Sequence, residues 1–209
     1  MAKLERLSAF ALNCTLKATS ADEPSSADKL LNDMLAAMEP YGVQGEVVRV
    51  ADHDIKPGVR SDEGPGDEWP DLRKRILAAD IFILGMPIWL GQPSSIAKRV
   101  LERLDAFLEE TDDAKRMPAA GKVAVVAVVG NEDGAHHCHA ASFQALNDVG
   151  FTIPANGGAY WVGEAMKSVN YVDLKKVPKE VNATLEMLAS NTTHLARILK
   201  AATYPGLPG

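Results

Sequence analysis

The sequence predicts an α/β protein built on one open, doubly wound parallel sheet with helices on both faces. Apolar segments of strand length alternate with segments of helical periodicity along the 209 residues. The two most apolar strand candidates, DIFILG (80–85) and GKVAVVAVVG (121–130), are apolar at consecutive positions, as strands buried on both faces are. About five strands of this kind fit one sheet at this length. We therefore expect a single domain spanning residues 1–209.

The strand candidates are short, apolar and in part β-branched. The second strand, for example, supplies Val47, Val48 and Val50. The five candidates are residues 5–13, 43–50, 80–85, 121–130 and a short strand within residues 151–162.

Five segments carry apolar residues at helical spacing. The clearest covers residues 93–110, where a proline opens the helix, Ser94 or Ser95 can cap it, and Val100 and Leu104 repeat on one face. The helix candidates are residues 26–39, 67–79, 93–110, 133–149 and 177–200. The intervening residues 52–67 combine proline, glycine and charge, which predicts a surface loop.

Composition and charge exclude several classes of protein. A net charge of −6 argues against a nucleic-acid or anionic-membrane surface. No apolar run approaches the roughly 20 residues of a membrane span. The first residues, MAKLERLS, lack the apolar core of a signal peptide, and Cys14 and Cys138 are too far apart to form a C-x-x-C pair. We expect a cytoplasmic protein with no membrane span and no nucleic-acid partner.

In an open α/β sheet the ligand lies beyond the carboxyl ends of the strands, so the loops after Asn13, Gly85 and Gly130 are the candidate site. The first of these loops leads through a hydroxyl-rich segment onto a helix N-terminus, an arrangement that binds anions. The residues that can hold a phosphate there are Thr15, Lys17, Ser25 and Ser26.

This first loop lacks the usual nucleotide fingerprints. Residues 7–27 contain no glycine, which excludes both the Walker loop and the G-x-G-x-x-G dinucleotide motif. A cradle built from side chains suits a terminal monophosphate. The alternative is an ordinary strand-to-helix loop, in which Ser25 and Asp28 form a capping box.

The second loop, MPIWLGQPSS (86–95), suits a flat ring. Pro87 and Pro93 stiffen its ends, and Gly91 lets the backbone come close to a planar ligand. Trp89 can stack on a ring cofactor or meet its edge. The alternative is that the Trp89 side chain only packs the margin of the sheet.

The third loop, GNEDGAHHCH (130–139), mixes acids and imidazoles. Glu132 and Asp133 are expected to cap the following helix. His136 and His139 share a helix face, so we also considered zinc. The further ligands would have to come from His53, Asp52 or Asp54. Contacts to a bound aromatic ring or solvated positions fit these histidines better, and we expect no metal.

Together the three loops resemble those of the flavodoxin-like NAD(P)H-dependent flavin and quinone reductases, over residues 5–160. The phosphate loop of that family matches Cys14-Thr15-Leu16-Lys17 followed by Ser25-Ser26-Ala27, its ring loop matches Pro87-Ile88-Trp89-Leu90-Gly91, and its third loop matches Gly130-Asn131-Glu132-Asp133-Gly134. Three features depart from the family. Lys17 replaces the usual arginine, Ala27 replaces the usual threonine, and the loop between Lys17 and Ser25 is longer.

The resemblance implies a flavodoxin-like three-layer sandwich with a five-stranded parallel sheet in the order 2-1-3-4-5. It also implies non-covalent FMN, with the ring between residues 87–91 and 131–134. The expected cofactor-binding residues are Thr15, Lys17, Ser25, Ser26, Ala27, Pro87, Ile88, Trp89, Leu90, Gly91, Asn131, Glu132, Asp133, Gly134 and His137. No residue is singled out as catalytic.

The implied activity is a two-electron reductase that transfers hydride from NAD(P)H through FMN to a quinone, a flavin or a similar small acceptor. One alternative is a flavodoxin-type electron carrier without NAD(P)H turnover, and another is a zinc-dependent protein. The family also implies a homodimer, in which the partner subunit walls the flavin pocket. Trp89, Tyr160, Trp161 and the helix over residues 93–110 offer the surface for it.

Overall fold

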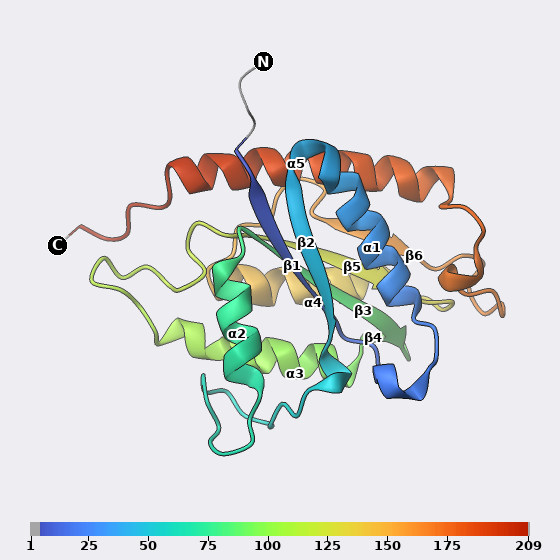
Figure 1. Cartoon of the computed structure of the whole chain (residues 1–209), viewed down its shortest axis with the longest axis horizontal. Helices are drawn as coiled ribbons and strands as arrows, with labels where there is room; N and C mark the ends of the chain where they lie inside the picture. The colour runs from blue at the N-terminus through green and yellow to red at the C-terminus, as the bar shows by residue number, and fades with distance from the viewer. Residues whose placement is uncertain (1–4, 209) are drawn as a thin grey trace.

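A computed structural model describes residues 5–208. Residues 1–4, which belong to the segment expected to lack a signal peptide, lie outside the described residues. Five parallel strands form the sheet in the order β2-β1-β3-β5-β6 (Figure 1). They are β1 (Leu7–Asn13), β2 (Val43–Arg49), β3 (Ile81–Trp89), β5 (Val123–Val129) and β6 (Gly158–Trp161). The flavodoxin-like order predicted from the sequence is confirmed, since the extra strand β4 (Gln92–Pro93) only forms a hairpin with the end of β3.

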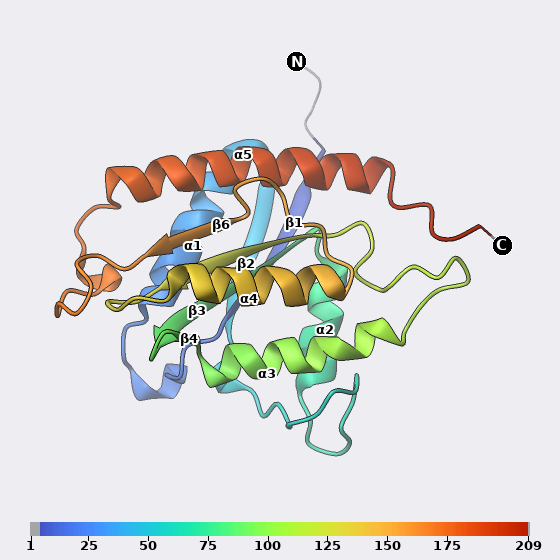
Figure 2. The same cartoon turned by 180° about the vertical axis from the view of Figure 1, so that it is seen from behind.

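Helices cover both faces of the sheet (Figures 1 and 2). α1 (Ser26–Met38) and α5 (Lys179–Ala201) pack on one face, and α2 (Trp69–Ala78), α3 (Ser95–Leu104) and α4 (Ala135–Asp148) pack on the other. Successive side chains of a strand point to opposite faces. Phe10 and Leu12 of β1 therefore belong to the core under α2, α3 and α4, whereas Ala9 and Ala11 belong to the core under α1 and α5.

The loop expected over residues 86–95 is largely a hairpin, which corrects the prediction that the third strand ends at Gly85. β3 continues because β5 is long enough to pair with Met86 and Pro87. The chain then reverses at Leu90 and Gly91, whose φ angles are +51° and +75°, and Trp89 pairs with Gln92. The following helix is also shorter than predicted, because α3 ends at Leu104 and a 3-10 turn (Asp105–Leu108) takes over.

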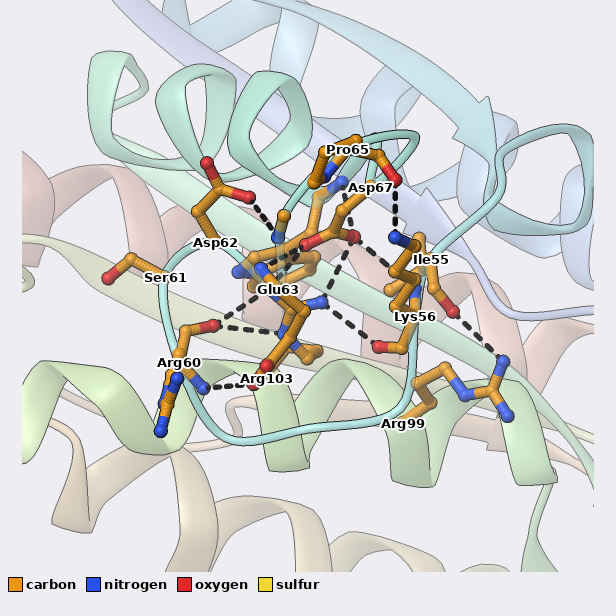
Figure 3. Close-up of polar contacts among 12 residues, drawn as sticks. Ile55, Lys56, Arg60, Ser61, Asp62, Glu63, Pro65, Asp67, Arg99 and Arg103 are labelled. Atoms are coloured by element: carbon orange, nitrogen blue, oxygen red, sulfur yellow. Dashed lines mark hydrogen bonds and ion pairs between the residues drawn. The ribbon is translucent and has the colours of Figure 1, made fainter.

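A buried ion pair fixes the long loop over residues 52–67 on α3 (Figure 3). Arg103 of α3 pairs with Asp67 at 2.8 Å, and both side chains are fully buried. The same guanidinium donates to the backbone carbonyls of Lys56 and Arg60. Burial raises the pKa of Asp67, but the hydrogen bonds from Arg103 and from nearby backbone N–H groups outweigh it and hold this pKa well below its usual range.

Candidate functional site

A cavity of about 240 Å³ opens at the carboxyl ends of β1, β3 and β5, where the sequence placed the site. Four stretches of chain line it, three of them the predicted loops. The lining residues are Thr15, Leu16, Lys17, Pro24, Ser25, Ser26, Ala27, Pro87, Ile88, Trp89, Val129, Gly130, Asn131, Glu132, Asn170, Tyr171, Val172 and Asp173.

One end of the cavity is built from hydroxyl groups at the N-terminus of α1. Ser25 caps the helix, its Oγ accepting from the Asp28 N–H at 3.2 Å, but the reciprocal bond of the expected capping box, from the Ser25 N–H to the Asp28 carboxylate, is absent. The carboxylate of Asp28 instead accepts from Arg49 and Asn13. Thr15 is buried beside Ser25, and the first-turn N–H groups have no intrahelical acceptors. This end can therefore hold an anion.

Lys17 is the cation of this end, and it is not free. Its ammonium group pairs with Glu23 at 2.9 Å and donates to the carbonyl of Pro24 at 3.4 Å. Both charged side chains are substantially exposed, so the pair is worth little and can give way to a stronger anion.

The opposite end of the cavity is more apolar. Trp89 stands at the end of β3 with about half of its surface exposed, next to Pro87 and Ile88. Glu132 accepts a hydrogen bond from the Gly91 N–H at 3.1 Å and so joins the second loop to the third. A flat ring can lie against this end.

Five of the expected cofactor residues do not line the cavity: Leu90, Gly91, Asp133, Gly134 and His137. Gly91, Asp133 and Gly134 form the contact between the hairpin turn and the third loop, where Gly134 lies against Gly91, and the side chain of Leu90 is exposed at the turn. The expectation that Glu132 and Asp133 cap α4 is wrong. Gly134 occupies the N-cap position, at a φ of +127° that disfavours any residue with a Cβ, and it offers no side chain to cap the helix.

The histidines of α4 do not line the cavity. His137 is exposed and bonds Gln92 at 2.9 Å, and His136 lies 3.2 Å from the Tyr160 hydroxyl. His139 is buried against Phe143, and burial lowers its pKa to about 4. Within residues 5–208 no three His, Cys, Asp or Glu side chains come close enough together to hold a metal ion. The zinc alternative therefore gains no support.

The sequence reasoning missed the fourth wall of the cavity, residues 170–173. Tyr171 is fully buried there, and its hydroxyl donates to Asp33 of α1 at 2.7 Å. Burial raises the pKa of this phenol above its ordinary value. The segment follows β6, so the rule that ligands lie beyond the carboxyl ends of strands would have pointed to it.

The sequence profile described as NADPH-dependent FMN reductase matches residues 11–167. The chain belongs to this family. It is an FMN-dependent oxidoreductase with NAD(P)H as its reductant, as the resemblance of the three loops implied. The electron-carrier alternative is accordingly set aside.

Two comparisons agree on one relative. The chain is 35% identical over 208 residues to the 8-demethyl-8-aminoriboflavin-5'-phosphate synthase of Streptomyces davaonensis, covering 95% of this chain and 80% of that protein. It also resembles the crystal structure of RosB with a bound intermediate, 8-demethyl-8-formylriboflavin-5'-phosphate. The TM-score is 0.86 at 34% identity, and 95% of this chain and 82% of that chain are covered.

A second relative is named for a different activity. The chain is 35% identical over 206 residues to the divalent metal cation transporter MntH of Mycobacterium bovis, but it spans only 30% of that protein. None of the helices described here is both long and apolar enough to cross a bilayer.

Proposed function

We propose that the cavity binds FMN non-covalently, with the phosphate at Thr15, Lys17, Ser25 and Ser26 and the ring between residues 87–91 and 131–134. The polarity of the cavity carries this proposal. Hydroxyl groups and a helix N-terminus gather at one end, and Trp89 with its apolar neighbours gathers at the other. This polarity matches a molecule with a phosphate at one end and an aromatic ring system at the other.

The other expected residues differ in how directly they can act on the cofactor. Ala27 and Asn131 line the cavity and can contact the cofactor directly. The pair of glycines at 91 and 134 sets the spacing of the two ring loops. His137 contacts the ring only after its bond to Gln92 breaks, so it is the least direct member of the set.

Bound FMN would supply hydride-transfer chemistry between NAD(P)H and a quinone, a flavin or a similar small acceptor. The chain itself orients the partners and excludes water. Trp89 walls one side of the ring position, and residues 129–132 line the cavity beside it. No side chain of the cavity is assigned as an acid, because no titratable group there combines burial with a free proton aimed at the ring position.

A second candidate is that a flavin phosphate is the substrate and is itself altered. The 35% identity across 95% of the chain to a synthase named for an aminated flavin phosphate favours it. Chromatography with mass detection of the flavin recovered after turnover distinguishes the two roles. An unchanged FMN supports the cofactor role, and a flavin of new mass supports the substrate role.

We also propose that the active form is a homodimer formed around the cavity mouth. Large apolar side chains stand exposed on the segments that border the cavity. They are Leu16, Trp89, Leu90, Tyr160 and Met166. Clustered exposed apolar side chains mark interaction surfaces. The cavity is also smaller than the roughly 300–1,000 Å³ of a typical ligand pocket, so a second copy can supply the missing wall.

We propose that the enzyme works in the cytoplasm. Its reductant is a cytoplasmic metabolite, and Cys14 and Cys138 are both free and buried, as reduced thiols in that compartment are. Fractionation of the source cell followed by immunodetection tests this proposal, and recovery outside the cytoplasmic fraction contradicts it.

The phosphate placement is tested by Lys17→Ala, with the exposed α3 residue Lys98→Ala as the matched control. A charge-assisted hydrogen bond contributes about 1.5–3 kcal/mol, so the dissociation constant of FMN should rise about tenfold or more in Lys17→Ala. Fluorescence titration of the apo protein measures it. Equal affinity in Lys17→Ala and Lys98→Ala refutes the placement, and wild-type protein that binds no flavin refutes the site.

A further inference from the structure

The side chain of Asn13, at the end of β1, is fully buried and fully bonded. Its Oδ1 accepts from the backbone N–H of Thr15 at 3.0 Å. Its Nδ2 donates to Ser25 Oγ at 3.2 Å and to Asp28 Oδ1 at 2.5 Å. The amide can take only this orientation, because a backbone N–H can only donate and an ionised carboxylate can only accept. Asn13 therefore ties the phosphate loop to the first turn of α1.

Asp28 is itself held in place. Its other oxygen, Oδ2, forms an ion pair with Arg49 at the end of β2 and accepts from Arg49 Nε at 2.8 Å. Both side chains are mostly buried. The chain of contacts runs from Arg49 through Asp28 to Asn13, and it joins the ends of the two adjacent strands β2 and β1 to the helix.

These contacts decide what the Ser25 hydroxyl can do. A serine oxygen has two acceptor positions and one proton. Both acceptor positions of Ser25 are occupied, one by the Asp28 N–H and one by Asn13 Nδ2, each at 3.2 Å. The only capacity left is the proton, so Ser25 can act toward the cavity only as a donor.

The other two hydroxyls of the cradle each have one acceptor position occupied. Thr15 Oγ1 accepts from the Lys17 N–H at 3.4 Å, and Ser26 Oγ accepts from the Val172 N–H at 3.2 Å. Each keeps its proton for a ligand. A phosphate dianion only accepts, so it matches the donor-only Ser25. The alcohol that ends an unphosphorylated flavin must also donate its own proton, and Ser25 has no acceptor position left for it.

We propose that Asn13 is a positioning residue that sets Ser25 as a donor and thereby gives the site its preference for phosphorylated over unphosphorylated flavin. This inference rests on the proposed placement of the FMN phosphate. Asn13 touches no part of the ligand and acts through Ser25.

The test compares dissociation constants of FMN and riboflavin, measured by flavin fluorescence on the apo protein. The phosphate preference is the ratio of the two constants. In Asn13→Ala this preference should fall by about tenfold, as it should in Ser25→Ala. Because Asn13 acts through Ser25, the phosphate preference of the double variant should be no lower than that of either single variant. The control is Asn32→Ala, which changes an exposed asparagine on α1, the helix that Ser25 caps, and should keep the wild-type preference.

Three results would overturn the inference. An equal weakening of both ligands in Asn13→Ala indicates a structural role alone. Additive losses in the double variant show that Asn13 does not act through Ser25. If Asn13→Ala does not fold, Asn13→Leu takes its place, since leucine has a similar shape but no amide to donate to Ser25, and an unchanged preference there contradicts the inference. A wild-type protein with no preference for FMN refutes the phosphate placement itself, which is a separate failure.

Discussion

Gly134 and Gly91 lie so close that a Cβ on Gly134 would come within 2.6 Å of the Gly91 Cα. The two residues belong to the two loops between which we place the flavin ring. Their contact is reinforced by the hydrogen bond from the Gly91 N–H to Glu132. The spacing of the ring site therefore depends on the absence of a side chain at residue 134.

Gly134→Ala should separate the two loops and weaken FMN binding by tenfold or more, measured by fluorescence titration. The neighbour it meets is backbone, which cannot move aside cheaply. Gly64→Ala is the matched control, because Gly64 also has a positive φ, +91°, but nothing lies within 4 Å of its added Cβ. An unchanged FMN affinity in Gly134→Ala would show that the ring does not lie between these loops.

Leu90→Asn should convert the proposed dimer to a monomer. Leu90 is 92% exposed at a φ of +51°, a conformation that Asn adopts more readily than Leu, so the substitution should not destabilise the fold. Multi-angle light scattering should give twice the 22.4 kDa chain mass for the wild type and the chain mass for the variant. Met187→Gln, at an exposed position on α5, is the control for loss of an exposed apolar side chain. A monomeric wild type with flavin bound and reductase activity intact would contradict the dimer.

Asp67→Asn should lower the free energy of unfolding by about 3–5 kcal/mol at neutral pH, because it leaves the buried Arg103 without a counter-charge. The folded pKa of Asp67 lies below its unfolded value, so its contribution is present above about pH 4 and is lost as the pH falls below that. Urea unfolding at pH 7 and pH 3 should therefore show a smaller difference between wild type and variant at pH 3.

The control for Asp67→Asn is Glu102→Gln, which removes an exposed partner of Lys98. An exposed pair contributes at most about 1 kcal/mol. If both substitutions cost the same at pH 7, the buried pair does not fix the loop over residues 52–67 as we describe.

The sequence predicted the sheet and the meeting of three loops because both follow from local patterns. Consecutive apolar residues identify strands such as β5, and parallel strands bring their carboxyl ends to one edge. The continuation of β3 to Trp89 could not be predicted locally, since it depends on how far β5 extends beside it. The role of Gly134 was missed for the same reason, because it is set by the approach of Gly91.

Two parts of the site left no periodic signal. Residues 170–173 form a wall without regular spacing of apolar residues, and only their position after β6 indicates them. In the sequence Asn13 is only the polar residue that ends an apolar strand. Its importance comes from hydrogen-bond partners 12 and 15 residues away that the fold brings to it.

We propose that this cavity holds FMN for reduction by NAD(P)H. The most direct test of this proposal is anaerobic stopped-flow mixing of the FMN-reconstituted protein with NADPH, following the visible absorbance of the flavin, with Ser25→Ala protein and free FMN run alongside. We expect rapid bleaching in the wild type, slower bleaching in the variant at FMN concentrations that saturate only the wild type, and none with free FMN on that timescale. A wild-type protein that binds FMN and does not bleach with NADPH or NADH would contradict the proposal.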